Sequence, residues 1–292
     1  MGHPLHEPVL RWYAACARDL PWRAPGATPW GIVVSEVMLQ QTPVARVLPA
    51  WYEWLSRWPS PAALAAASPG DAVRAWGRLG YPRRALRLHQ AAVAMTTRYA
   101  GQVPDTVDAL RALPGVGGYT AAAVASFGFG VRTAVVDTNV RRVHARAVTG
   151  VGRAEPSLTR AEHALAERLL PEAPDVARRW NVAVMELGAL VCTARAPRCA
   201  ACPVADRCAW ARAGHPAYQG PARRAQKFEG TDRQVRGALL QVLRTAEDAV
   251  TDAELTAASP TDPARRRRCL AGLVADGLVE PLPAGRYRLP AR

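Results

Sequence analysis

Four of the six cysteines in this 292-residue chain lie close together. They are Cys192, Cys199, Cys202 and Cys208, a C-x6-C-x2-C-x5-C spacing. Four thiolates can hold Zn²⁺ or an iron–sulfur cluster. A structural zinc site usually has two C-x2-C pairs, and only Cys199 and Cys202 form one here. The spacing lets one compact loop wrap a larger object, so it favours an iron–sulfur cluster, with zinc as the alternative.

Glu36 is a carboxyl group in an apolar stretch, PWGIVVSEVMLQQTPVARVL. On a helix its neighbours at three and four residues are Ile32, Val33, Leu39 and Gln40. Burial there raises a carboxyl pKa and keeps the group protonated near neutral pH. A neutral carboxyl can donate a proton, so Glu36 is a candidate general acid. The alternative is a glutamate at the wet edge of a helix.

Asp137 is the second candidate carboxylate, in the stretch TAVVDTNVRRV. It follows an apolar run and precedes a helical pattern, so it is also a candidate N-cap. The two roles are compatible, because a helix N-terminus stabilises an ionised carboxylate. One proton donor and one ionised carboxylate form the usual pair for breaking a glycosidic bond.

A glycine-rich turn, Leu113-Pro-Gly-Val-Gly-Gly118, separates two helical patterns. Glycines permit a tight turn and a close approach of backbone to a ligand. The second helix begins directly after the turn, and its first amide groups lack intrahelical partners. The turn is therefore a candidate site for a DNA phosphate, and the alternative is a tight turn without a ligand.

The charge balance favours a polyanionic partner. The formal net charge is +14, and of the 38 basic residues only Lys227 is a lysine. Nucleic acid is the common partner of so basic a chain. We find neither an apolar run of membrane-spanning length nor a signal-peptide pattern, and we therefore expect a cytoplasmic protein whose cysteines stay reduced.

Helical periodicity dominates up to about residue 215, with Pro and Gly between the helices. A Pro-, Gly- and Arg-rich stretch, residues 216–230, is predicted to be a linker. Beyond it, three helical patterns and two short strands around a glycine turn resemble a winged-helix unit. The expected helices are 9–17, 32–41, 44–58, 62–67, 71–79, 84–99, 106–113, 119–127, 139–148, 156–170, 177–190, 233–245, 252–258 and 263–276.

Together these features resemble the helix-hairpin-helix DNA glycosylases of the endonuclease III superfamily, and within it the MutY-type adenine DNA glycosylases. The resemblance covers about residues 10 to 215. Besides the cysteine loop it is carried by RDLPWR (18–23), SEVMLQQTPVARV (35–47), LGYPRRALRLH (79–89), LPGVGGYTAAA (113–123), VVDTNVRRV (135–143) and MELGALVCT (185–193).

The resemblance implies an all-α fold with two subdomains and a [4Fe-4S] cluster on the four cysteines. Residues 21–128 would form a six-helix barrel with the hairpin, and residues 1–20 with 129–215 an iron–sulfur helical domain. Residues 231–292 would add the small winged-helix-like α+β unit. The cluster would brace a loop against DNA without taking part in bond chemistry.

The implied partner is double-stranded DNA that holds a mispaired adenine, bound by a monomer and associated with the nucleoid. The adenine would flip into a pocket, where Glu36 protonates it while Asp137 stabilises the sugar cation. Asn139 matches the family's asparagine beside that aspartate, and Tyr119 a further catalytic position. The other residues of the implied pocket and DNA surface are Arg23, Leu39, Gln40, Gln41, Tyr81, Leu113, Gly115, Val116, Gly117 and Gly118.

The scarcity of lysine favours a monofunctional enzyme. Superfamily members that also cut the backbone use a lysine amine just after the hairpin glycines, and this chain has Tyr119 there. The alternatives are an endonuclease III-like glycosylase with AP lyase activity and a non-catalytic iron–sulfur DNA-binding regulator. Both Glu36 and Asp137 match the family pattern, which argues against the regulator.

Three departures from the family pattern concern the mispair, in which the family expects 8-oxoguanine or guanine opposite the adenine. Pro82 stands where relatives usually have a second tyrosine near the opposing damaged guanine, and Val182 stands where they usually have Gln or Glu that contacts the adenine. Many relatives also carry a large C-terminal domain that reads 8-oxoguanine, whereas about 73 residues follow position 219 here. We therefore expect discrimination for 8-oxoguanine to be weaker or achieved differently.

Overall fold

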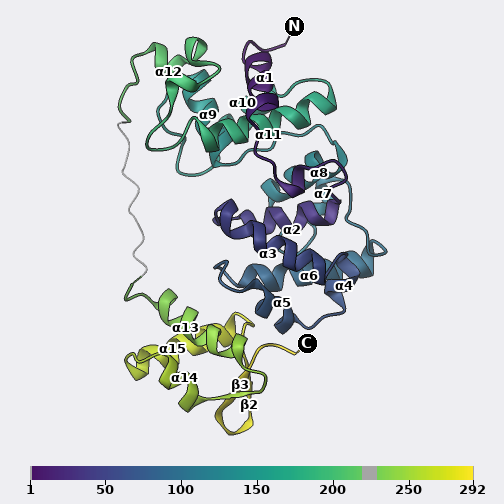
Figure 1. Ribbon diagram of the computed structural model, residues 1–292, viewed down its shortest axis with the longest axis vertical. Coiled ribbons are helices and arrows are strands. Elements are labelled where there is room, and N and C mark those ends of the chain that lie inside the picture. The colour runs from purple at the N-terminus through teal and green to yellow at the C-terminus, as the bar shows by residue number, and fades with distance from the viewer. Residues whose placement is uncertain (1, 219–228, 292) are drawn as a thin grey trace. The chain divides into compact units, whose positions relative to one another are not determined.

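The computed structural model describes residues 2–218 and 229–291, so most of the predicted linker and Lys227 lie outside the described residues. The described chain is mainly helical, with a small sheet near its C-terminal end (Figure 1). The α-helices of the described chain before residue 219 are α1 (His6–Cys16), α2 (Pro29–Leu39), α3 (Val44–Arg57), α4 (Pro61–Ala65), α5 (Pro69–Trp76), α6 (Arg83–Arg98), α7 (Val107–Arg111), α8 (Gly118–Phe129), α9 (Thr138–His144), α10 (Arg160–Arg168), α11 (Pro174–Leu190) and α12 (Ala209–Arg212). No helix within the described ranges has the length and apolar character that crossing a membrane requires.

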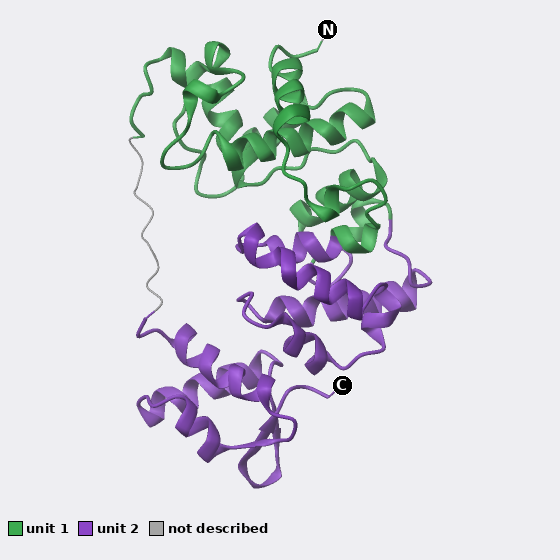
Figure 2. Cartoon of the chain, viewed as in Figure 1, with its two compact units in different colours: residues 1–32, 105–111, 116–222 green, residues 33–104, 112–115, 223–292 purple. Residues whose placement is uncertain are grey.

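The chain divides into two compact units (Figure 2). Unit 1 comprises residues 1–32, 105–111 and 116–222, and unit 2 comprises residues 33–104, 112–115 and 223–292. The finer division expected from the sequence, into a cluster domain, a barrel and a C-terminal domain, stays a prediction.

Unit 1 joins the N-terminal helix to the cysteine-containing region. Helix α1 packs against α11, and α11 packs against α9. Their shared core includes Val9, Val140, Trp180 and Leu187, each at most 3% exposed. This packing fixes α9, whose first residue follows Asp137.

Aromatic packing forms the core of the helical part of unit 2. Trp54 on α3 is 1% exposed and Trp76 on α5 is fully buried. The Trp54 ring lies edge-on to Trp58 at 4.6 Å and to Trp76 at 5.6 Å between ring centroids. Helix α6 packs against both α4 and α5. These contacts hold the loop between α5 and α6, which carries Tyr81.

The C-terminal part of unit 2 has the predicted winged-helix-like order. Helix α13 (Asp232–Thr245) is followed by strand β1 (Val250–Thr251), helices α14 (Asp252–Ala258) and α15 (Pro263–Ala275), and strands β2 (Glu280–Leu282) and β3 (Arg286–Arg288). The antiparallel sheet has the order β1-β3-β2, with Val250 opposite Tyr287. The sequence did not predict β1, because two residues are too short to show alternation.

One expected helix, 156–170, begins too early in the prediction. Helix α10 starts at Arg160, because Thr159 caps it in a reciprocal capping box with Glu162. The residues before Thr159 lie outside the helix, where the Glu155 and Ser157 carbonyls accept hydrogen bonds from the Arg141 guanidinium.

Candidate active site

Glu36 lies in α2 and is 6% exposed, so the burial expected from its apolar neighbours is confirmed. Ile32, Val33 and Val37 on the same helix are also buried. Helix α2 ends at Leu39, two residues earlier than predicted. Glu36 is therefore a carboxyl group within the protein interior, near the C-terminal end of a short helix.

The buried guanidinium of Arg84 explains where α2 ends. Its Nη1 donates to the carbonyls of Val37 at 2.8 Å, Met38 at 3.0 Å and Gln40 at 2.7 Å. Its Nη2 donates to the Gly80 carbonyl at 3.0 Å. Burial lowers the pKa of Arg84 to about 10, which still leaves the group charged at neutral pH. One cation thus joins the last turn of the Glu36 helix to the Tyr81 loop.

Replacing Arg84 with alanine is expected to destabilise the fold by about 3 kcal/mol or more, because it leaves several buried carbonyls without donors. The measurement is the urea midpoint of unfolding, compared with an Arg83→Ala control. Arg83 is exposed, and its ion pair with Asp276 is expected to contribute less than about 1 kcal/mol. Equal midpoints for the two variants would contradict this role of Arg84.

Asp137 caps helix α9, as the sequence predicts. Its Oδ1 accepts hydrogen bonds from the backbone N–H groups of Asn139 at 2.8 Å and Val140 at 2.7 Å. Its Oδ2 accepts from the Asn139 side-chain amide at 2.6 Å. The carboxylate is thereby held in a single orientation by three donors from the first turn of the helix.

Burial raises the pKa of Asp137 above the ordinary value of 3.8. The hydrogen bonds from Val140 and Asn139 and the charge of Arg142 lower this pKa and offset part of the effect of burial. The expected stabilisation of the ionised form by the helix N-terminus is therefore present but smaller than the cost of burial.

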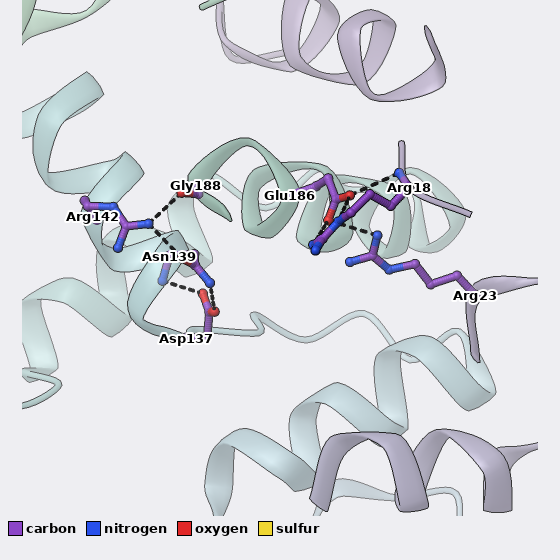
Figure 3. A network of polar contacts seen from close by, with 7 residues as sticks. All are labelled: Arg18, Arg23, Asp137, Asn139, Arg142, Glu186 and Gly188. Carbon is purple, nitrogen blue, oxygen red and sulfur yellow. Dashed lines mark hydrogen bonds and ion pairs between the residues drawn. The ribbon is translucent and has the colours of Figure 1, made fainter. Parts of the chain in front are cut away.

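A chain of hydrogen bonds joins Asp137 to Gly188 through Asn139 and Arg142 (Figure 3). Arg142 Nη2 donates to Asn139 Oδ1 at 2.7 Å and to the Gly188 carbonyl at 2.6 Å. Arg142 Nε donates to the Cys192 carbonyl at 2.6 Å. Asn139, the residue that orients Asp137, is thus fixed by the same guanidinium that holds the backbone of the first cysteine.

Two further residues of unit 1 position the segment that ends at Asp137. A Cβ atom on Gly188 would lie 2.7 Å from the Cβ of Asn139, so glycine permits the close approach of α11 to α9. Asn181 is buried, accepts from the Val135 N–H at 3.2 Å and donates to Ser126 at 3.1 Å. Tyr119 is half-buried and packs against a small cluster that contains Val135. Tyr119 therefore packs against the same apolar cluster as Val135, which lies two residues before Asp137.

Arg23, a predicted pocket residue, contacts a buried carboxylate that the sequence interpretation overlooked (Figure 3). Glu186 on α11 is 0% exposed and accepts from Arg23 at 3.0 Å and from Arg18 at 2.7 Å. Burial alone would raise the pKa of Glu186, but hydrogen bonds and charges from Arg18 and Arg23 outweigh it, and the pKa is lowered. An acidic residue inside an apolar helix was the available signal, the same one that selected Glu36.

The glycine-rich hairpin has the local geometry expected of a close backbone approach. Gly115 has φ +77°, and a Cβ there would lie 2.6 Å from the Cβ of Arg87. Gly117 is the N-cap of α8, and both Gly117 and Gly118 are exposed with open space where a Cβ would stand. Leu113 and Val116 are buried and anchor the turn. The first amides of α8 thus begin at an exposed, unobstructed turn.

Among the predicted DNA-surface residues of unit 2, Leu39 is the last residue of α2, and Gln40, Gln41 and Tyr81 lie in two loops. Leu39 and Gln40 are half-buried, whereas Gln41 and Tyr81 are exposed. Both exposed residues have positive φ, +58° for Gln41 and +46° for Tyr81, which is uncommon for residues other than glycine. The helix predicted to continue through Gln41 instead turns there.

The four cysteines line one small cavity together with Arg146 and Trp210. Arg146 Nη1 donates to Cys192 Sγ at 3.3 Å, and Cys208 Sγ lies 3.4 Å from the Arg146 carbonyl. In the part of the chain that the structure describes, no three His, Cys, Asp or Glu side chains form a site for one metal ion. A shared sulfur-lined cavity beside a buried cation fits a cluster held by four thiolates, and such a cluster supplies a cross-link between distant parts of the loop.

Replacing Cys202 with alanine is expected to remove the brown colour of the purified protein and to lower its unfolding temperature, because cluster binding contributes to folding. Visible absorption and iron content are the measurements. Cys16→Ala is the matched control, since Cys16 is exposed and far from the loop in sequence. An equally coloured Cys202→Ala protein would show that Cys202 does not hold the cluster.

Comparison with known families supports the assignment of an iron–sulfur cluster to the four cysteines and identifies the family of the whole chain. The family model for HhH-GPD superfamily base excision DNA repair proteins matches residues 34–171, and that for the iron-sulfur binding domain of endonuclease III matches residues 192–208. The chain is 56% identical over 283 residues to the adenine DNA glycosylase of Mycobacterium tuberculosis, covering 97% of this chain and 92% of the relative. The chain belongs to the adenine DNA glycosylase family. It carries the [4Fe-4S] cluster of the endonuclease III type on the loop 192–208.

Some more distant relatives match a shorter part of this family member. The human adenine DNA glycosylase is 42% identical over 213 residues, which cover 68% of this chain and 38% of the human protein. A solved thermostable thymine-DNA glycosylase has a TM-score of 0.64 at 28% identity, covering 71% of this chain and 94% of its own. An endonuclease III structure at 22% identity, with a TM-score of 0.59, has the same fold. The all-α helix-hairpin-helix glycosylase fold predicted from the sequence is thereby confirmed.

Proposed function

We propose that this glycosylase removes adenine mispaired with 8-oxoguanine or guanine from double-stranded DNA, as a monomer and by hydrolysis alone. Identity of 56% to an adenine DNA glycosylase along almost the whole chain is the observation that carries the proposal. The chain's own chemistry is consistent with it, since it supplies a buried carboxyl, Glu36, and an oriented carboxylate, Asp137.

In the proposed reaction Glu36 donates a proton to the extruded adenine, which makes the base a better leaving group. The bond between the sugar and the adenine breaks, and water adds to the sugar cation and loses a proton. Asp137 faces the positive charge that develops on the sugar, and its hydrogen bonds from Asn139 and Val140 keep it oriented. Glu36 belongs to unit 2 and Asp137 to unit 1, so their meeting in one pocket is part of the proposal.

Duplex binding is assigned to backbone groups as much as to side chains. The exposed start of α8 at Gly117 and Gly118 offers amide donors to a phosphate. The net charge of +14 adds long-range attraction to the duplex. Gln41 and Tyr81, both exposed, are assigned to the opened base stack.

Single-turnover adenine release tests this function. The substrates are duplexes in which adenine faces 8-oxoguanine, guanine, cytosine or thymine. We expect release opposite 8-oxoguanine and guanine, and release at least about 100-fold slower opposite thymine. A further duplex with an oxidised pyrimidine tests the endonuclease III-like alternative. Release of thymine or of the oxidised pyrimidine in place of adenine would overturn the proposal.

Borohydride trapping distinguishes hydrolysis from lyase chemistry. A lyase forms a Schiff base between a lysine amine and the sugar, which borohydride reduces to a stable adduct. Tyr119 occupies the position after the hairpin glycines, so we expect little trapped adduct. Trapping in high yield would favour the endonuclease III-like alternative.

A further inference from the structure

The C-terminal part of unit 2, residues 229–291, is fixed to helix α5 by hydrogen bonds between side chains and backbone. Arg74 donates to the Ala246 carbonyl at 2.9 Å, and Arg244 Nε donates to the Val73 carbonyl at 3.0 Å. The Gly70 N–H donates to the Pro290 carbonyl at 2.7 Å, and a Cβ on Gly70 would lie 2.6 Å from that oxygen. Because each part donates to the other, the winged-helix-like part has a defined position on α5.

The C-terminal part also contacts the start of α6 and the loop between α5 and α6. Arg83 at the start of α6 pairs with Asp276 at 3.2 Å. Arg233, in the first turn of α13, donates from Nη2 to the Tyr81 hydroxyl at 3.1 Å. Its guanidinium carbon lies 5.2 Å from the centroid of the Tyr81 ring, within the range of a cation–π contact. The C-terminal part thus places an exposed arginine directly against an exposed aromatic ring.

The backbone under Tyr81 is strained and firmly held. Positive φ at Tyr81 and Gln41 costs free energy that other contacts must offset. Arg84 provides those contacts, since it donates to the Gln40 and Gly80 carbonyls and lies 5.7 Å from the Tyr81 ring. Two strained loops that present exposed side chains are therefore locked by one buried cation, as expected for a preformed binding surface.

We propose that Arg233 is a specificity-determining residue that recognises the base opposite the excised adenine. The inference rests on the proposed adenine-release function. An exposed aromatic ring beside arginine is a stacking platform for a nucleic-acid base. Arg233 reaches the hydroxyl edge of the Tyr81 ring, where its guanidinium can donate to the edge of a stacked base.

Guanine is the base type that fits this donor. It presents two adjacent acceptors, O6 and N7, to a bidentate arginine. In 8-oxoguanine N7 carries a hydrogen, and the acceptors on that edge are the carbonyl oxygens O6 and O8. The major-groove edge of cytosine presents an amino donor instead. Arg233 is therefore expected to favour adenine mispaired with guanine-type bases over adenine mispaired with cytosine.

The test is the ratio of single-turnover adenine release opposite guanine to that opposite cytosine, with 8-oxoguanine as a third arm. We expect Arg233→Ala to reduce the ratio on the order of tenfold, the discrimination of one bidentate contact. Arg233→Lys keeps the positive charge but lacks the two parallel N–H donors of a guanidinium. Its ratio is therefore expected to lie between those of Arg233→Ala and the wild type. Arg98→Ala is the control: Arg98 is an exposed arginine at the far end of α6, and its loss is expected to leave the ratio unchanged.

Tyr81→Phe is the second variant, because Arg233→Ala could also loosen the docked part. It removes the hydroxyl that orients Arg233 and keeps the ring, so a smaller shift in the same direction is expected. Equal slowing opposite all three bases in both variants would overturn the assignment of Arg233. A wild-type protein that releases no adenine would instead refute the proposed function, so the two failures are distinguishable.

Discussion

Replacing Glu36 with glutamine is expected to slow adenine release by about 10²- to 10⁴-fold, equivalent to about 3–5 kcal/mol of transition-state stabilisation. Glutamine has nearly the same shape as glutamic acid but cannot donate a carboxyl proton. Because Glu36 is buried within α2, the change leaves the exposed surface as it is. Duplex binding should therefore survive while the chemical step is lost.

Two measurements separate these effects. Single-turnover release gives the rate of the chemical step, and a binding titration on an A·G duplex gives the affinity. Glu53→Gln is the matched control, since Glu53 is exposed on α3 of the same unit. A Glu36→Gln protein with the wild-type rate would remove Glu36 from its role, and one that lost binding alone would assign it to the surface instead.

Replacing Asp137 with asparagine is expected to lower the rate by about 10²- to 10³-fold, the usual effect of removing one preorganised electrostatic group. Asparagine is also a good N-cap, and its oxygen can still accept from the Asn139 and Val140 N–H groups. The helix should therefore remain, and the loss should come from the missing negative charge opposite the sugar cation.

The same substitution is expected to remove a pH-dependent cost to the stability of the free protein. Burial raises the pKa of Asp137, so the folded state is destabilised where the group must ionise. Asparagine has no such cost, but its Nδ2 replaces the oxygen that accepts from the Asn139 side chain at 2.6 Å. The urea midpoint of Asp137→Asn relative to that of the wild type should therefore fall as the pH decreases through the raised pKa towards the ordinary value of 3.8, below which both states of the wild type are protonated. Asp175→Asn, at an exposed first-turn position of α11, should show no such pH dependence.

Most of the fold could be predicted from the spacing of apolar residues along the chain. This spacing, with the positions of Pro and Gly, predicted nearly all of the helices, and the glycine turn predicted the β2–β3 hairpin. Strand β1 was not predicted, because two residues are too short to show alternation. The true start of α10 was missed although Thr159 and Glu162 form a local capping box, and Arg141 binds the carbonyls of Glu155 and Ser157 outside the helix.

The residues of the candidate site also fall into two groups, those that the sequence predicted and those that it did not. Glu36, Asp137 and the four cysteines were found from residue type and spacing, since each stands out from its local pattern. Arg84 and Arg142 were missed, because their importance comes from partners 44 and 50 residues away. Glu186 was overlooked although it shows the same local signal as Glu36, an acidic residue inside an apolar helix. In an arginine-rich chain, no local feature distinguishes a buried guanidinium from a solvated one.

The most direct test of two carboxyl groups in opposite protonation states is the pH dependence of single-turnover adenine release from an A·G duplex. We expect a bell-shaped profile, in which the rate falls at low pH as Asp137 is protonated and at high pH because the proposed role of Glu36 requires its protonated form. The raised pKa of Asp137 places the acid limb above that of an ordinary aspartate. The residual activity of Glu36→Gln should keep the acid limb and lose the alkaline one. An alkaline limb that Glu36→Gln leaves unchanged would contradict Glu36 as the proton donor.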